Sequence, residues 1–101
     1  MDRAPTPIEV LPAVVDAVGE RVEVYVDGGV MSGADVVAAV ASGARAALVG
    51  RAYLYGLMAG GERGVQRAAD ILTTEITGTL GLLGVPAVRD LRRDHVRMRT
   101  A

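Results

Sequence analysis

The sequence predicts an α/β fold in which helices and strands alternate in the order α-β-α-β-α. Two short apolar runs, at 22–26 and 46–49, have the character of strands, and each leads into glycine. A helical pattern at 34–42 lies between them, so the three segments form a βαβ unit with parallel strands and a right-handed crossover. Further helical patterns precede the first strand and follow the second.

The first helix is expected to begin at Pro7, because threonine as N-cap followed by proline at the first helical position is typical of a helix start. Apolar residues then recur at helical spacing as far as Val18, and Gly19 is the predicted C-cap. Pro12 lies near the first turn, where proline costs less than deeper in a helix. Residues 1–5 are expected to be a loose start.

The run VEVYV at 22–26 predicts a strand that is buried on both faces. AALV at 46–49 predicts the second strand, which ends at Gly50. Two parallel strands leave two unpaired edges, and three helices bury both faces of such a sheet poorly. We therefore expect the chain to be one part of a larger sheet.

The second half of the chain is predicted to be mostly helical. A short helical turn at 51–58 is followed by a break at GGERG, residues 60–64, and then by a long amphipathic helix over 62–83. Residues 85–101 form a polar tail with a possible short helix at VRDL. Its arginines predict a solvated tail or a subunit contact: Arg92, Arg93, Arg97 and Arg99.

Composition narrows the classes of function. The 101 residues carry a net charge of −1 and no cysteine. A polybasic field that would indicate nucleic acid or an acidic membrane is therefore missing, and disulfide and thiolate chemistry are excluded. No signal-peptide pattern is recognised, and no apolar run reaches the roughly 18 residues of a membrane span. These features favour a cytoplasmic location.

The most informative stretch is DGGVMSGAD at 27–35, directly after the first predicted strand. Gly28 and Gly29 permit positive φ and close approach of the backbone to a ligand. Backbone N–H groups in such a turn can hold an anion, and the helix that starts near Gly33 would add its positive end. An ordinary tight turn explains the same pattern, so this loop alone leaves both interpretations open.

The second predicted strand runs into LVGRAYLYG, residues 48–56, where Arg51 follows Gly50. Arg51 could bind a phosphate bidentately at the carboxyl edge of the sheet, and a surface salt bridge is the ordinary alternative. The two loops together say more, because phosphate sites of (β/α)8 barrels often lie in the loops after the last two strands. The sequence therefore predicts a partial barrel that contains those two strands.

From Asp27 to Val65 the sequence resembles the carboxyl-terminal signature of the FMN-dependent α-hydroxy-acid oxidases and dehydrogenases. That family includes glycolate oxidase, the flavin-type L-lactate dehydrogenase and mandelate dehydrogenase. Its pattern is Asp-Gly-Gly-X-Arg-X-Gly-X-Asp followed by Gly-Arg-Pro or Gly-Arg-Ala, and TGTLGLLGVPAVRDL is similar to its closing helix and tail. The resemblance implies that residues 1–101 are the carboxyl-terminal segment of a barrel that oxidises 2-hydroxy acids to 2-oxo acids.

The resemblance also implies a set of residues that line the phosphate and ribityl part of an FMN site. Met31 stands where the family pattern has arginine, and a thioether is at best a weak acceptor. Loss of one charge-assisted hydrogen bond is expected to cost about 1.5–3 kcal/mol, or about one to two powers of ten in affinity. The implied cofactor-binding residues are Asp27, Gly28, Gly29, Val30, Met31, Gly50 and Arg51.

No catalytic residue and no metal ligand is expected within the chain. The family's catalytic histidine lies in a His-Gly-Gly-Arg-type segment, which the resemblance places just ahead of Met1. His95, the single histidine, is expected to be a solvated residue of the tail. Tyr53 and Tyr55 are expected to pack as amphipathic rings against barrel residues.

Two alternatives stay open. One is another phosphate-binding barrel, such as type 2 isopentenyl-diphosphate isomerase or IMP dehydrogenase. The other is a non-catalytic truncated fragment or a module that buries its exposed sheet by self-association. For the complete enzyme, the resemblance implies FMN and a small 2-hydroxy acid as partners, a homo-oligomer, no nucleic acid and no membrane span. It leaves peripheral attachment to a membrane open.

Overall fold

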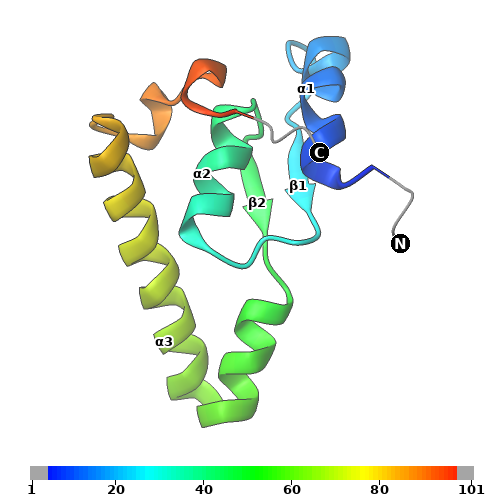
Figure 1. The fold of residues 1–101 in the computed structure, drawn as a ribbon. Helices are drawn as coiled ribbons and strands as arrows, with labels where there is room; N and C mark the ends of the chain where they lie inside the picture. Colours follow the sequence, from blue (N-terminus) through cyan, green and yellow to red (C-terminus); the bar gives the residue numbers. More distant parts are fainter. Residues whose placement is uncertain (1–4, 98–101) are drawn as a thin grey trace.

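The structure is a computed structural model that describes residues 5–97. Its main elements follow one another as helix, strand, helix, strand, helix, as Figure 1 shows, so the predicted α-β-α-β-α order is confirmed. The bounds are α1 Pro7–Val18, β1 Tyr25–Asp27, α2 Gly33–Ala41, β2 Ala46–Leu48 and α3 Arg51–Leu83, with the 3-10 helices η1 Val88–Asp90 and η2 Arg93–His95.

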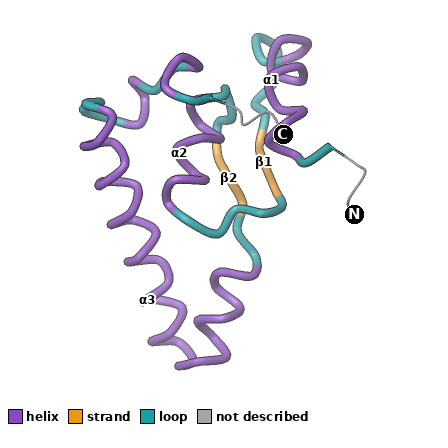
Figure 2. The backbone as a smooth tube through the Cα atoms, in the orientation of Figure 1, coloured by secondary structure: helices purple, strands orange, loops and turns teal. Residues whose placement is uncertain are grey.

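The two strands form a parallel sheet in which Val26 pairs with Ala47. α2 connects them, so the predicted βαβ unit is present (Figure 2). Because the strands are parallel, their carboxyl ends meet at one edge of the sheet. The loops that lead to α2 and to α3 both begin at this edge.

The first strand is shorter than predicted, and only one of its faces is buried. It covers Tyr25–Asp27 instead of 22–26. Val26 is 4% exposed, whereas Tyr25 on the opposite face is 55% exposed. The prediction of a strand buried on both faces is therefore wrong for this chain, because the described residues cover only the face that carries Val26.

The core lies between the sheet and the first two helices. It is built from small and branched side chains, which suits a chain that has no Phe or Trp. α1 begins as predicted, and the Glu9 carboxylate accepts a hydrogen bond from the Thr6 N–H at 3.3 Å. The buried members of the core cluster are Leu11, Val26, Val30, Ala39 and Ala44.

α3 consists of two helical segments joined at Gly60 and Gly61. Gly61 has φ +61°, so the chain leaves helical geometry there and turns back. The second segment then runs beside α2, and the two segments of α3 form a hairpin that projects beyond the sheet (Figure 1). A Cβ at Gly56 or Gly64 would collide with the backbone of the other segment. The predicted short helix, break and long helix are confirmed.

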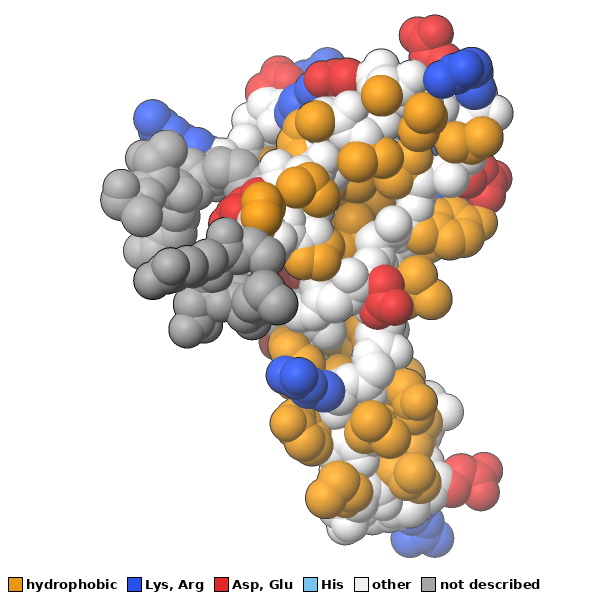
Figure 3. Space-filling model, turned by 90° about the vertical axis from the view of Figure 1, so that its right-hand side faces the viewer, with side chains coloured by type: hydrophobic (Ala, Val, Ile, Leu, Met, Phe, Trp, Pro, Cys, Tyr) orange, Lys and Arg blue, Asp and Glu red, His pale blue; other side chains and the backbone are white. Residues whose placement is uncertain are grey.

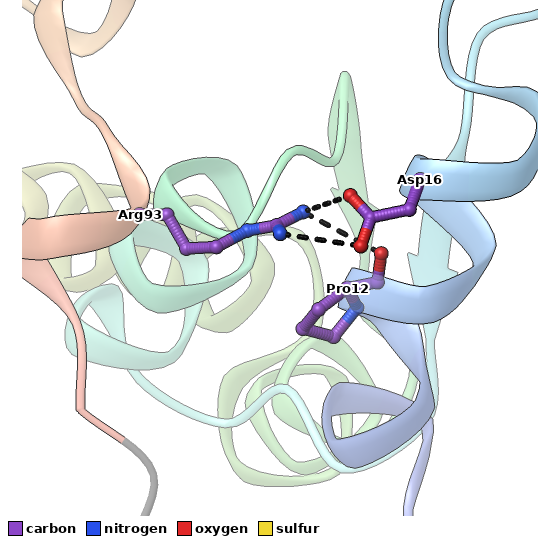
Figure 4. A network of polar contacts seen from close by, with 3 residues as sticks. All are labelled: Pro12, Asp16 and Arg93. Carbon is purple, nitrogen blue, oxygen red and sulfur yellow. Dashed lines mark hydrogen bonds and ion pairs between the residues drawn. The ribbon is translucent and has the colours of Figure 1, made fainter.

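The tail folds back onto α1. The Arg93 guanidinium donates to the Asp16 carboxylate, with a shortest N–O distance of 3.1 Å, and to the Pro12 carbonyl oxygen at 3.4 Å (Figure 4). Arg93 is exposed, in line with the expected solvated tail, but it also forms an ion pair within the chain, which was not predicted. Arg99 lies outside the described residues.

Candidate functional site

A pocket of about 270 Å³ opens at the carboxyl edge of the sheet, where the loops after β1 and β2 meet. Every cofactor-binding residue predicted from the sequence lines it, so the fold brings the two loops together. Leu48 also lines the pocket and was not predicted, although its place near the end of the predicted strand at 46–49 was a usable signal. The lining residues are Asp27, Gly28, Gly29, Val30, Met31, Leu48, Gly50 and Arg51.

At Gly28 and Gly29, the loop after β1 lines this pocket with backbone atoms alone. Gly28 has φ +105° and Gly29 has φ +77°, both in the left-handed region that side chains disfavour. A Cβ at Gly29 or at Gly50 would meet no atom within 4 Å, so both glycines border open space. Positive φ thus accounts for glycine at 28 and 29, and the open space leaves the backbone accessible to a ligand.

The amino end of α2 is closed by carboxylates of the chain itself. The N–H groups of Met31 and Ser32 both donate to the Asp35 carboxylate, at 3.0 and 3.1 Å. The Gly33 N–H donates to Oε1 of Glu75 at 3.0 Å. Two carboxylates of the chain therefore lie at this helix end and oppose the contribution that the α2 dipole was expected to make to an anion site.

The amino end of α3, in contrast, has no side-chain cap. Gly50 is the N-cap residue and lacks a side chain that could accept from the first turn, whose N–H groups have no intrahelical partner. Arg51 is exposed and belongs to neither ion pair found among residues 5–97. The helix dipole and the guanidinium therefore add positive potential on the same side of the pocket.

The lining also includes Asp27 and Leu48, which pair across the two strands. An ionised carboxylate only accepts hydrogen bonds, so Asp27 suits a hydroxyl donor and disfavours a phosphate beside it. Leu48 is 48% exposed and offers an apolar wall. The pocket lining therefore combines one cationic side chain, one carboxylate that can accept hydrogen bonds and one apolar side chain.

Val30 and Met31 contribute in different ways. Val30 is 6% exposed and belongs to the core cluster, so its side chain packs and it offers a ligand mainly its backbone. Met31 is 45% exposed and lines the pocket without a charge. Arg51 is therefore the only cationic side chain in the lining that the structure describes.

Two further polar residues lie away from the pocket. His95 is half-buried, and its Nδ1 accepts a hydrogen bond from the Arg92 N–H at 2.9 Å. It belongs to η2, which contacts α2. The Tyr25 hydroxyl donates to Glu23 at 2.6 Å, and this hydrogen bond, together with the negative charge of Glu23, raises the pKa of Tyr25. Neither residue lines the pocket.

Apolar side chains gather on the projecting hairpin of α3 (Figure 3). Tyr53 and Tyr55 are 43% and 57% exposed, and Met58 is 80% exposed. The expectation that both tyrosines pack is not met within this chain. The first segment of α3 has no charged residue between Arg51 and Glu62, so it is apolar around its whole circumference.

Comparison with known proteins identifies the family. The sequence model of the FMN-dependent dehydrogenase family matches residues 1–98. The chain is 56% identical over 96 residues to a putative L-lactate dehydrogenase of Mycobacterium tuberculosis. This match covers 95% of this chain and 23% of that protein. It is also 53% identical over 91 residues to the pre-mycofactocin synthase of the same species, and this match covers 90% of this chain and 23% of that protein.

A solved structure gives the same result. A soluble mutant of the membrane-associated (S)-mandelate dehydrogenase from Pseudomonas putida matches 98% of this chain and 28% of its own, with a TM-score of 0.90 and 40% identity. Fold and sequence thus define a segment of a flavoenzyme. The chain belongs to the FMN-dependent dehydrogenase family. It spans about a quarter of the length of the curated relatives it matches.

Within residues 5–97, no helix has both the length and the apolar character to cross a membrane.

Proposed function

We propose that the chain is the carboxyl-terminal segment of a (β/α)8 barrel and that its two strand-end loops hold the phosphate and ribityl groups of FMN. The observation that carries this proposal is that both loops line the same pocket. Its cationic side, made by Arg51 and the open end of α3, suits a phosphate dianion. Its acidic side, made by Asp27, suits the hydroxyl groups of a ribityl chain.

In this role the chain binds and orients the cofactor. FMN, when bound, supplies the redox chemistry that takes a 2-hydroxy acid to a 2-oxo acid. Arg51 fixes the phosphate, and the glycine loop lets the backbone approach it closely. Relatives with the different names putative L-lactate dehydrogenase and pre-mycofactocin synthase are similarly close to this segment, at 56% and 53% identity. That similarity supports a role in holding the shared cofactor and not in choosing the substrate.

The substrate class proposed for the complete enzyme is a small 2-hydroxy acid of the lactate or glycolate type. The relatives named L-lactate dehydrogenase and (S)-2-hydroxyacid oxidase support this choice over the other phosphate-binding barrels. In the full-length protein that contains this segment, lactate or glycolate should bleach the absorbance of the flavin. Persistence of the oxidised flavin spectrum with every 2-hydroxy acid tested would contradict the substrate assignment.

A second candidate function concerns the chain on its own, as a module that self-associates without catalysis. The exposed apolar residues of α3 and of the open sheet face favour it, because contiguous apolar surface of this kind marks an interaction site. Tyr25 and Leu48 on the sheet and Met58 on the hairpin are each about half exposed or more. A homo-oligomer is the proposed state.

The cofactor proposal is tested by titrating the purified chain with FMN and with riboflavin, which lacks the phosphate. Quenching of flavin fluorescence reports both affinities. We expect FMN to bind more tightly, and we expect Arg51→Ala to reduce this preference by about one to two powers of ten. Arg45→Ala is the matched control, because Arg45 is exposed and pairs with Glu23 outside the pocket. Equal affinity for the two flavins would contradict the proposal.

A further inference from the structure

The glycine loop is tied to a distant part of the chain by one side chain. Oε1 of Glu75, in the second segment of α3, accepts a hydrogen bond from the Gly33 N–H at 3.0 Å, and the contact is partly buried. The two residues are 42 positions apart in the sequence. Gly33 follows the loop directly, so Glu75 holds the point at which the loop enters α2.

The packing around Gly33 leaves no space for a side chain at that position. Gly33 is buried, and a Cβ there would collide with the Cβ of Glu75 and with the backbone of Ile76. α2 therefore docks directly on α3 by its first residue. The hydrogen bond and the close approach fix both the direction and the distance of this contact.

α3 consequently holds both sides of the pocket. Its first residue is Arg51, the cation of the lining, and its later residue Glu75 anchors the loop that faces Arg51. Glu75 also places a negative charge at the amino end of α2. An anion is thereby disfavoured at that helix end and left to the uncapped end of α3.

We propose that Glu75 is a positioning residue that sets the glycine loop against Arg51 and directs the phosphate to the amino end of α3. This inference rests on the proposed FMN site. Glu75 does not line the pocket, so it acts through the backbone of Gly33 and the loop before it.

The test compares Glu75→Ala and Glu75→Gln in the same chain, with FMN and riboflavin as the probes. Glu75→Ala is expected to weaken FMN binding by about tenfold, as loss of a charge-assisted hydrogen bond implies. Riboflavin binding should change less, because it has no phosphate to misplace. Glu75→Gln keeps an acceptor and should restore most of the preference for FMN. A merely structural role would weaken both flavins alike.

Asp70→Asn is the matched control, since Asp70 lies on the same segment, is exposed and contacts only Gln66 among its reported hydrogen bonds. If wild-type chain binds both flavins equally, the proposed function fails. If it prefers FMN and Glu75→Ala keeps that preference, the role of Glu75 is overturned. Amide hydrogen exchange without flavin is the independent measurement: Glu75→Ala should speed exchange at Gly33 by about tenfold, and unchanged exchange would also overturn the inference.

Discussion

Among single residues, Met31 gives the most specific prediction of the proposed site. It lines the same pocket as Arg51 without offering a charge, where the family pattern has arginine. Met31→Arg should add a charge-assisted hydrogen bond to the phosphate and tighten FMN binding by about one to two powers of ten. Fluorescence titration measures the change.

The control for this variant is Met58→Arg, which adds the same charge at a position that is 80% exposed on the hairpin and outside the pocket. It should leave FMN affinity nearly unchanged. Riboflavin affinity should not respond to either variant. If Met31→Arg fails to tighten FMN, or tightens riboflavin equally, the guanidinium does not reach a phosphate.

All lining residues except Leu48 were predicted from the sequence, because their signal is local. Glycines with positive φ and a Gly–Arg pair, each directly after a strand, are visible in a few neighbouring letters. Glu75 was not predictable, because a glutamate in an amphipathic helix gives no sign of a partner 42 residues away. The part of Glu75 in closing the α2 end was missed for this reason, whereas the part of Asp35 is local, because its partners lie only three and four residues away.

At the scale of elements, the contact between α2 and α3 is expected to be intolerant of added volume. Gly33→Ala should lower the free energy of unfolding by about 1–3 kcal/mol, because its Cβ would overlap Glu75 and the backbone of Ile76. Gly78→Ala is the matched control within α3, since a Cβ there meets nothing within 4 Å. Gly78→Ala should raise the free energy of unfolding by about 0.5–1 kcal/mol, because alanine has a higher helix propensity than glycine.

Denaturant unfolding followed by circular dichroism separates these two outcomes. Opposite signs for the two glycine substitutions would support direct docking of α2 on α3. Equal and small effects would show that the helices do not touch at Gly33.

The tail contact is predicted to be weak in spite of its geometry. Arg93 and Asp16 have side chains that are 48% and 67% exposed, so solvent screens the pair. Arg93→Ala should lower the free energy of unfolding by at most about 1 kcal/mol, and added salt should reduce that effect. Unfolding curves at low and high salt test this, with the exposed Arg97→Ala as control. A larger, salt-insensitive loss would contradict the assignment.

The order of the elements was predictable because the spacing of apolar residues and the glycines at the ends of elements are strong local signals in this sequence. The break in α3 followed from GGERG, and the structure places the reversal at Gly60 and Gly61. The strand at VEVYV was placed too early, because regular pairing with β2 begins only at Tyr25; before it, the Val24 carbonyl oxygen accepts a hydrogen bond from the Arg45 N–H at 2.7 Å. Pairing depends on the position of β2, which a local pattern does not contain.

At the scale of the whole molecule, the uncovered apolar surface predicts self-association. The purified chain should elute in size-exclusion chromatography as a species larger than its 10.5 kDa monomer. Met58→Lys on the exposed hairpin should shift elution towards the monomer, because a desolvated ammonium disfavours the contact. Arg97→Lys, which preserves the charge, should leave the elution unchanged. A monomer at all concentrations would contradict this expectation.

The second face of the sheet shows why burial could not be predicted fully. Val, Tyr and Ala in short strands indicate apolar surroundings on both sides, but the described residues supply helices on only one. The strand pattern fits a complete barrel of the proposed kind. The exposure of Tyr25 and Leu48 reflects how much of such a barrel this chain provides.

The central claim is that the loops after β1 and β2 hold the phosphate of FMN together. Amide hydrogen exchange, measured with saturating FMN and with saturating riboflavin, tests it most directly. We predict that FMN slows exchange in both loops, around Gly28–Gly29 and at the start of α3, and that riboflavin leaves the start of α3 unprotected. Protection by FMN that is absent from these loops, or that is the same for both flavins at Arg51, would contradict the claim.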